Sequence, residues 1–366
     1  MKILLVINKT LTNGKTTWID GGYYNVFLPL VDQGHTVQLY DTANLESPDP
    51  EKIIEDFKPD LIWACLTGNS RMTPSEPKVL EAIRKQTEKG NCTTFNWFCD
   101  DTWRFDDFSS IACKYFHVCS TPEPSYLKKY KEIGYNNIIL GGWHVNYNFY
   151  SNQKSDKLYD VVFIGQINNE DRLNGLRALL HNDINISIDH GLSHEEMIQK
   201  MCQSKVGINF SKNFNGNPRE NPKTQMKARP FEIAAANSLV FTEYHEGIEE
   251  FFGIDKEIIC FKGQDEMVEK CKILLKNDKL LQKISLSGHE RFKRDHTSHV
   301  RVQNILKEIK SLWKKEYTFK ITNLWARANG YMMDITEHGS IWGMKPYILT
   351  TGQSFVKLMI LKIVQL

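Results

Sequence analysis

The sequence predicts an α/β protein built from two Rossmann-like, doubly wound domains that face a central cleft. Short, nearly continuous apolar runs recur along the chain, as in parallel strands that are covered on both faces. Segments with helical spacing separate these runs. The alternation stops in a polar interval over residues 144–158 and then starts again, which indicates two domains and a linker.

The first domain is expected over residues 1–143. Its expected strands are 2–8, 36–41, 60–66, 92–98, 114–120 and 137–142. Helical spacing falls at 22–34, 74–89 and 123–133. This order of strand, helix and strand favours parallel pairing.

The second domain is expected over residues 159–297. Its expected strands are 161–166, 185–191, 205–211, 239–245 and 257–262, and its expected helices are 170–181, 193–203, 229–237 and 264–276. Helical patterning then continues over about 278–316, of which 298–316 forms a C-terminal helix outside the domain.

Residues 317–366 do not follow this pattern. They are rich in aromatic residues and glycine, and they end in the apolar run SFVKLMILKIVQL, which contains two lysines. We expect an appended helix docked on a core, with a membrane-surface helix as the second interpretation. The role of this extension is left open.

The composition is typical of a soluble globular protein, with 41% apolar and 25% charged residues. The 46 basic and 44 acidic residues give a net charge of +2, which does not indicate general adhesion to nucleic acid. The eight cysteines form no CxxC motif, and the N-terminal segment lacks the layout of a signal peptide. We therefore expect a cytoplasmic protein, which could also lie at the inner face of the membrane through the C-terminal segment.

Two carboxylates, Asp100 and Asp101, follow the apolar strand 92–98. A desolvated carboxylate at the carboxyl end of a strand could act as a general base, or it could simply cap the next turn. The two acids are adjacent, without the intervening residue of a DxD metal motif, so we predict no metal.

Glycines and a cation follow the first strand of each expected domain. Gly21 and Gly22 open a helix in the first domain, either as a plain turn or as a loop that contacts a ligand. In the second, Gly165 ends a strand and Arg172 lies early in the next helix, where an anion could bind.

The segment MKARPFEIAAANSLVFTEYHEG, residues 226–247, carries the strongest signal. Lys227 and Arg229 lie at or just before a helix N-terminus, where a diphosphate would gain charge-assisted bonds. Glu232 lies on the same side as Arg229 and could accept bonds from ribose hydroxyls. The same spacing would also fit a surface ion pair of little energetic value.

The segments KARPFEIAAANSLVFTEYHEGIEEFFGIDKEIICF, GHERFKRDHTSHVRVQNIL, FNWFCDDTWRF and FIGQ together resemble the CgeB-like glycosyltransferases of the GT-B fold. The resemblance spans roughly residues 1–312. It implies transfer of a sugar, of the hexosyl class, from a nucleotide diphosphate sugar, with a UDP-sugar as the expected donor and no metal or cofactor. The donor-binding residues that it implies are Gly165, Arg172, Lys227, Arg229 and Glu232, and the first domain would bind the acceptor.

The resemblance also bears on the mechanism. Many retaining members have two glutamates with seven residues between them; if Glu232 is the second, the first would fall at Thr224 here. The layout is similar to that of phage DNA β-glucosyltransferase, an inverting enzyme, which implies that Asp100 is the catalytic base. Further donor or acceptor contacts are expected among Gly21, Gly22, Asp101, His190, Gly191, Glu243 and Glu249, with His190 and Gly191 near the base of the nucleotide.

Several interpretations remain open from the sequence. The leading acceptor is a surface glycan, a lipid-linked acceptor or a protein, as in glycan biosynthesis. A hydroxylated base in DNA is the second choice, since the basic runs are interleaved with acids. An epimerase of the same fold and a non-catalytic sugar-nucleotide-binding protein would also fit the sequence.

Overall fold

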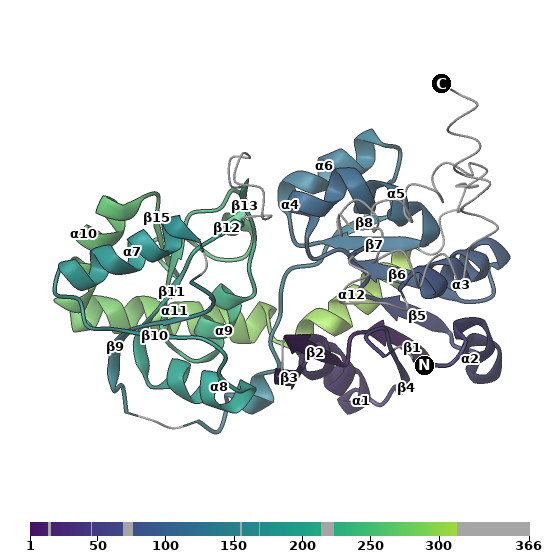
Figure 1. Ribbon diagram of the computed structural model, residues 1–366, viewed down its shortest axis with the longest axis horizontal. Coiled ribbons are helices and arrows are strands. Elements are labelled where there is room, and N and C mark those ends of the chain that lie inside the picture. The colour runs from purple at the N-terminus through teal and green to yellow at the C-terminus, as the bar shows by residue number, and fades with distance from the viewer. Residues whose placement is uncertain are drawn as a thin grey trace.

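A computed structural model confirms the two doubly wound α/β domains, which lie side by side (Figure 1). The structure describes residues 1–312 except 14–15, 45, 69–75, 154–155, 168 and 214–222. The predictions for residues 317–366 therefore lie outside the described residues.

The first domain contains a six-stranded sheet in which all pairs are parallel. Its strands are β1 (Lys2–Ile7), β4 (Thr36–Asp41), β5 (Leu61–Ala64), β6 (Thr93–Trp97), β7 (Val118–Thr121) and β8 (Ile138–Leu140). The spatial order is β4-β1-β5-β6-β7-β8, so the winding direction reverses between β1 and β5. Ligands of doubly wound sheets bind at the carboxyl ends of the strands near such a reversal.

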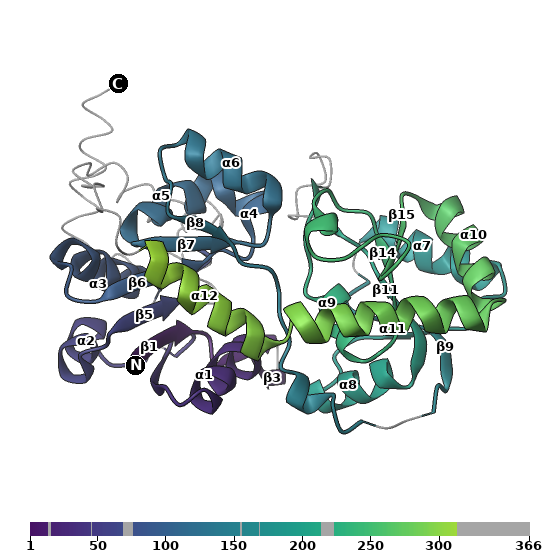
Figure 2. The same ribbon diagram turned by 180° about the vertical axis from the view of Figure 1, so that it is seen from behind.

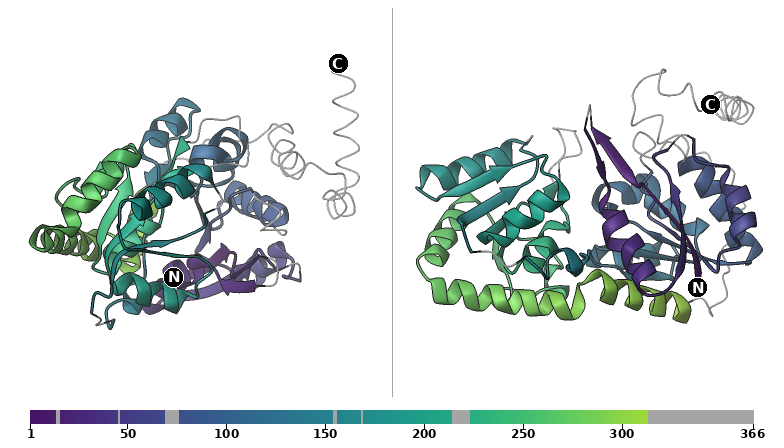
Figure 3. Two further views of the ribbon diagram at one scale, coloured as in Figure 1. Left: turned by 60° about the vertical axis from the view of Figure 1, so that its left-hand side comes forward. Right: turned by 90° about the horizontal axis from the view of Figure 1, so that it is seen from below.

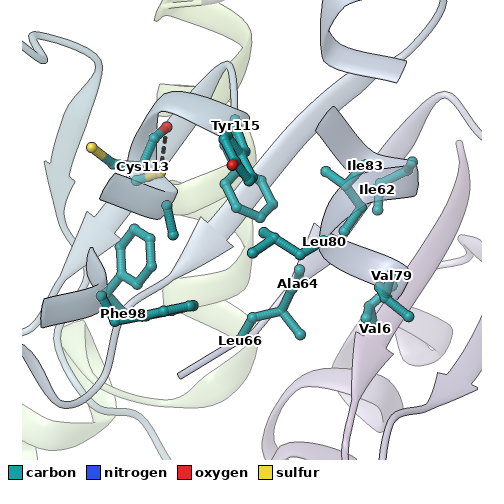
Figure 4. Packing of buried hydrophobic residues seen from close by; sticks show 14 of the residues in the cluster. Val6, Ile62, Ala64, Leu66, Val79, Leu80, Ile83, Phe98, Cys113 and Tyr115 are labelled. Carbon is teal, nitrogen blue, oxygen red and sulfur yellow. Dashed lines mark hydrogen bonds between the residues drawn. The ribbon is translucent and has the colours of Figure 1, made fainter. Parts of the chain in front are cut away.

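Helices from both ends of the chain cover this sheet. On one face lie α2 (Pro50–Phe57), α3 (Glu76–Lys89) and α6 (Pro124–Glu132), and Figure 4 shows Val6 and Ile62 of the sheet close to Val79 and Ile83 of α3. On the other face lie η1 (Tyr23–Phe27), α1 (Leu28–Asp32) and α12 (Ser298–Leu312). The chain therefore returns from the second domain to complete the core of the first.

Local structure in the first domain differs from the prediction before η1 and before β7. A hairpin of β2 (Thr10–Asn13) and β3 (Thr16–Ile19) precedes η1, and the strand expected over 114–120 starts only at Val118. The preceding segment instead forms α4 (Asp101–Arg104), η2 (Phe105–Ser109), α5 (Ser110–Ala112) and η3 (Cys113–Tyr115). The error arose because buried Tyr115 ends η3 and buried Phe116 follows it, and short apolar runs do not distinguish a buried helix from a strand.

The second domain contains a five-stranded parallel sheet. Its strands are β9 (Tyr159–Ile164), β10 (Ile186–Asp189), β11 (Ser204–Asn209), β14 (Leu239–Glu243) and β15 (Ile259–Phe261), in the order β10-β9-β11-β14-β15. The winding reverses between β9 and β11. Helices α7 (Glu170–His181) and α10 (Gln264–Leu275) cover one face, α8 (His194–Cys202) and α9 (Arg229–Ala235) cover the other, and α11 (Asp278–Asp295) contacts both cores. A short antiparallel pair, β12 (Lys212–Asn213) with β13 (Lys223–Thr224), follows β11.

Two segments connect the domains: the chain around Val145, which follows β8, and the junction between α11 and α12. These two segments lie against each other. The α11 helix runs along the second domain, and α12 continues onto the first after a bend (Figures 2 and 3). At the bend, Ser298 donates its backbone N–H to the Val145 carbonyl at 2.8 Å, and Val145 and Thr297 form a parallel β-bridge. The helical pattern expected over 278–316 is therefore interrupted at His296, which ends α11.

Candidate active site

A cavity of about 460 Å³ lies where the winding of the second sheet reverses. Its wall is formed by the carboxyl ends of β9 and β11, the start of α7 and the start of α9. The lining residues are Phe163, Ile164, Gly165, Gln166, Asn169, Arg172, Asn209, Phe210, Lys212, Lys227, Ala228, Arg229 and Glu232. The volume and the position match those of small-molecule sites in doubly wound folds.

This cavity brings together all five residues that the sequence predicted as donor contacts: Gly165, Arg172, Lys227, Arg229 and Glu232. Gly165 follows β9 directly, and a Cβ there would lie 3.2 Å from the Phe163 ring. The side chain of Asn169 caps α7 by accepting the backbone N–H of Arg172 at 2.8 Å. These local features fix the start of α7 against the cavity.

Arg172 presents one cation to the cavity. Its Nη1 donates to the Gln166 carbonyl, and its guanidinium lies 5.7 Å from the centre of the Phe163 ring. Burial lowers the pKa of Arg172, an effect that Glu243 partly offsets and Arg229 reinforces. An arginine stays protonated despite such a shift, so a partly desolvated positive charge is held at this wall.

Lys227 presents a second, more deeply buried cation. Burial lowers its pKa, and the neighbouring Arg172 lowers it further, whereas Asp100 and Glu123 raise it. Its Nζ donates to the side-chain oxygen of Gln225 at 3.0 Å. The ammonium therefore lies between the cations of the second domain and the carboxylates of the first.

Arg229 and Glu232 form an ion pair in the cavity wall, with Nη1 and Oε2 2.6 Å apart. Arg229 Nη1 also contacts the Met197 sulfur of α8 at 3.0 Å. The ion pair that the spacing also allowed is thus present, but it lines a cavity. Since α9 has only seven residues, the side-chain charges, more than a helix dipole, make this wall suitable for an anion.

Asp100 lies in the first domain, just after β6, and contacts the second domain. Its Oδ1 accepts the side-chain N–H of Gln225 at 2.8 Å. Gln225 also accepts from Lys227, so two hydrogen bonds connect the Asp100 carboxylate to the cavity wall.

Asp101 lies in the interior of the first domain. Its side chain is fully buried, and the Tyr130 hydroxyl lies 3.1 and 3.0 Å from its two oxygens. Burial raises the pKa of Asp101 to about 7, although hydrogen bonds from Thr121, Ser109 and Tyr130 oppose the rise. The ligand contact expected for Asp101 is therefore not compatible with this arrangement, because the carboxylate points into a packed core.

Glu243 lines a smaller adjoining cavity of about 190 Å³. Its carboxylate accepts the backbone N–H groups of Ser211 and Lys212 at 3.0 and 3.1 Å, and it pairs with the Lys212 ammonium at 3.5 Å. These contacts hold the segment after β11 in place beside the main cavity.

The remaining predicted contacts do not line either of these two cavities. Gly22 donates its backbone N–H to Asp20 at 2.8 Å, with Gly21 beside it at the start of η1. His190 and Gly191 are exposed at the carboxyl end of β10, and Glu249 is exposed beside Tyr244, whose pKa it raises. Their roles stay predictions.

Several polar residues at this site were not predicted from the sequence. Asn169 could have been found, since an Asn directly before Glu170 and Asp171 is a helix-start signal. Lys212 also lines the cavity, and its ammonium pairs with Asp171 at 3.0 Å. Three further residues, Gln225, Glu123 and His245, take part only in the contact between the two domains. Within the described ranges, no group of three His, Cys, Asp or Glu side chains is arranged to hold a metal ion, and no helix is long and apolar enough to cross a membrane.

Comparison with known proteins supports the same fold. Residues 155–307, less than half of the chain, match the family model described as "Glycosyl transferase-like". No curated protein matches the chain in sequence.

Several solved structures are similar over most of their length. One is an α-glucosyltransferase in complex with UDP-glucose and DNA containing an abasic site, with a TM-score of 0.56 and 11% identity, covering 85% of this chain and 99% of that one. Another is Alr3699/HepE from Anabaena in complex with UDP, with a TM-score of 0.57 and 11% identity, covering 85% and 100%. A third is AviGT4, a glycosyltransferase involved in avilamycin A biosynthesis, with a TM-score of 0.58 and 10% identity, covering 86% and 98%. The chain therefore has the GT-B fold of these glycosyltransferases.

Proposed function

We propose that this protein is a glycosyltransferase that moves a sugar from a nucleoside diphosphate sugar to a hydroxyl group. The observation that carries the proposal is the cavity at the reversal of the second sheet, where Arg172, Lys227 and Arg229 converge with Glu232. Desolvated cations suit a diphosphate, and a carboxylate one helical turn away suits the vicinal hydroxyls of a ribose. UDP is the nucleotide that we favour, because the similar structures with Alr3699/HepE and the α-glucosyltransferase contain UDP or UDP-glucose.

Each cavity residue has a distinct role in this proposal. Arg229, Lys227 and Arg172 neutralise the diphosphate and stabilise the negative charge that develops on it when the sugar leaves. Glu232 accepts hydrogen bonds from the ribose and remains oriented by its ion pair with Arg229. The acceptor binds in the first domain, opposite this cavity.

Asp100 is the proposed catalytic base of an inverting reaction. It takes the proton of the acceptor hydroxyl, whose oxygen forms a bond to the anomeric carbon as the bond from that carbon to the diphosphate breaks. Thr224 occupies the position of the first glutamate of the retaining pattern, and its hydroxyl lies 2.9 Å from His245 Nδ1. Thr224 therefore does not supply the carboxylate that the retaining pattern has at this position.

The acceptor class that we favour is a cell-surface glycan, a lipid-linked acceptor or a protein, as in the CgeB-like resemblance. A hydroxylated base in DNA is the second class, and one similar structure is a glucosyltransferase bound to DNA. The two classes differ in their products, so an acceptor panel with hydroxymethylated duplex DNA as one member distinguishes them.

The proposal is tested by incubating the full chain with UDP-glucose, UDP-galactose, UDP-N-acetylglucosamine, GDP-mannose and dTDP-glucose. Release of the nucleotide diphosphate and the mass of the sugar product are measured, first with water and then with the acceptor panel. We expect turnover of at least one donor, and a decrease of about 10²- to 10⁴-fold in Asp100→Asn, because a positioned general base contributes that much. UDP binding should be retained in this variant.

Asp106→Asn is the matched control, because Asp106 is exposed in the same segment of the first domain and should leave turnover unchanged. An isomerised nucleotide sugar without release of nucleotide would show an epimerase instead. Donor binding without any turnover would show a non-catalytic binding protein.

A further inference from the structure

The segment Thr224–Lys227 of the second domain is held against the first domain by its backbone. The Met226 N–H donates to Glu123 Oε1 at 2.8 Å, and the Met226 carbonyl accepts the indole N–H of Trp143 at 2.9 Å. Glu123 follows β7 of the first sheet, and Trp143 lies between β8 and the linker. Both backbone groups of Met226 are thus fixed by residues outside the second sheet.

A buried hydrogen bond between Glu123 and His245 strengthens this contact on its other side. Glu123 is fully buried, and its Oε2 lies 2.6 Å from His245 Nε2 of the second domain. His245 Nδ1 lies 2.9 Å from the Thr224 hydroxyl. Glu123 therefore contacts Met226 directly and Thr224 through His245, and it limits the movement of the segment.

Gln225, in the middle of this segment, has both ends of its side-chain amide engaged. Its Nε2 donates to Asp100 Oδ1 at 2.8 Å and to the Cys99 carbonyl at 3.3 Å, and its Oε1 accepts from Lys227 Nζ at 3.0 Å. A carboxylate only accepts and an ammonium only donates, so these partners determine which way the amide faces. The residue is 2% exposed, which leaves its side chain little room to turn.

We propose that Gln225 is a positioning residue that orients Asp100 and connects it to the diphosphate site. The inference rests on the proposed function and deepens it. The Gln225 amide holds Oδ1 of Asp100, and an ammonium with three donors can bind a phosphate oxygen while it keeps its bond to Gln225. Binding of the donor at Lys227 thus stabilises the same hydrogen-bonded chain that fixes Asp100.

A purely structural role would have different consequences. The charged groups that influence this region are Lys227, Asp101 and Glu123, with Arg172 beyond Lys227. If Gln225 only filled space, its removal would lower stability without changing how activity depends on pH. A donor to an ionised carboxylate favours the ionised form, so its removal should shift that dependence.

The test uses the full chain with Gln225→Ala and Gln225→Glu, and Gln33→Ala as the matched control. Gln33 donates a comparable bond, from Nε2 to the His299 carbonyl at 2.8 Å, and it does not line the cavity. The kcat, the KM and the pH profile are measured with the nucleotide sugar that the wild type turns over, beginning with UDP-glucose. UDP affinity is measured separately by calorimetry.

We expect Gln225→Ala to lower kcat about 10²-fold, because a misplaced catalytic group costs that much, and to change KM for the donor less than about threefold. The acidic limb of its kcat profile should move to higher pH. Gln225→Glu keeps the shape but places a second carboxylate beside Asp100, so its acidic limb should move further in the same direction. Gln33→Ala should retain the wild-type profile.

Wild-type kcat and an unmoved acidic limb in both variants would overturn the role of Gln225 and leave the glycosyltransferase proposal intact. If Gln225→Ala fails to fold, the nearly isosteric Gln225→Glu decides by the same readout. A wild type that turns over no donor would overturn the proposed function, and the inference with it.

Discussion

Four cationic side chains share the wall of one cavity, and among the described residues that line it Glu232 is the only carboxylate. Burial lowers the pKa of both Arg172 and Lys227, which shows that the charged forms are held at a cost in desolvation. Residues arranged at such a cost are typical of functional sites, because a bound anion offsets the repulsion. At the scale of single residues, the excess of positive charge in the cavity wall is the main reason to expect an anionic ligand.

The lowered pKa of Lys227 predicts how UDP affinity depends on pH. In the free protein Lys227 loses its proton at a lower pH than an ordinary lysine at 10.5, whereas a bound diphosphate favours the charged form and raises this pKa. Binding therefore takes up a proton, and affinity should fall as the pH rises through the pKa of the free protein. Calorimetric titrations of UDP between about pH 7 and 10 measure this.

Lys227→Arg is the matched variant for this titration, because its charge persists over the whole range. Its affinity should fall less with pH, and ionisation of UDP itself affects both proteins alike. Equal pH dependence in the two proteins would show that Lys227 does not contact the diphosphate.

The sequence could predict the cavity residues that lie in local signals. Arg229 and Glu232 belong to one short segment, and Gly165 and Arg172 follow one strand. The bond between Gln225 and Asp100 joins residues that are 125 positions apart, and the pair of Glu123 and His245 spans 122. Such contacts depend on how two domains meet, which residue spacing does not reveal.

At the scale of elements, α11 packs closely against α9, whose first residues line the cavity. His289 Nδ1 of α11 lies 2.8 Å from the carbonyl of Ala234 in α9. Beside this contact, Gly288 passes the loop before β15 so closely that a Cβ would lie 2.3 Å from the Glu257 carbonyl oxygen. The small residue at 288 therefore sets how near α11 can lie to the rest of the domain.

Gly288→Ala should destabilise the protein by about 1–3 kcal/mol, since the added methyl group meets backbone that cannot rotate away. Urea unfolding followed by circular dichroism measures the free energy of unfolding. Leu286→Ala on the same helix is the control, because Leu286 is 54% exposed and its removal should cost little. A Gly288→Ala variant as stable as the wild type would show that α11 lies further from Glu257.

Elements with strong periodicity were predicted well, and irregular ones were not. The expected strand 36–41 coincides with β4, because its residues favour a strand and turn residues flank it on both sides. The antiparallel pair of β2 and β3 was missed because the residues of these strands alternate little in polarity. The helix expected over 22–34 divides into η1 and α1, a change of hydrogen bonding that spacing alone does not indicate.

At the scale of the whole molecule, buried histidines lie where the chain crosses between the domains. Burial lowers the pKa values of His144 and His296 to about 3, and the charge of Arg301 acts in the same direction. Arg301 donates to His296 Nδ1 at 2.7 Å, so the ring is neutral and its Nε2–H donates to the Phe251 carbonyl at 2.8 Å. Both rings are therefore uncharged where the chain passes between the domains.

This arrangement predicts a loss of stability in mild acid. Because the folded pKa values lie below the unfolded value of 6.5, the unfolded state binds protons first, and stability falls as the pH drops from about 6.5 toward 3. Each histidine should lower the free energy of unfolding by roughly 2 kcal/mol as the pH falls from about 6.5 to 5. Urea unfolding at several pH values measures this.

In the same experiment, the free energy of unfolding of His296→Gln should depend less on pH than that of the wild type, since glutamine can hydrogen-bond without taking up a proton. His299→Gln, at a partly exposed histidine of α12 beside Asp32, is the control and should keep it. Identical pH dependence in wild type and His296→Gln would contradict a neutral, buried ring.

The two-domain architecture followed from the alternation of strands and helices, but the packing of α12 on the first domain did not. Nothing in the spacing of Val302, Ile305 and Ile309 says which sheet they cover. The domain limits at residues 143, 159 and 297 stay predictions.

The central claim is that the cavity between α7 and α9 binds a nucleoside diphosphate, and titration of UDP into the full chain tests it most directly. The wild type and Arg177→Ala, at an exposed arginine of α7, should bind UDP with the same affinity. Arg229→Ala should bind about 10- to 100-fold more weakly, because a charge-assisted bond is lost. Equal affinity in Arg229→Ala, or no binding of UDP, GDP, dTDP or CDP to the wild type, would contradict the claim.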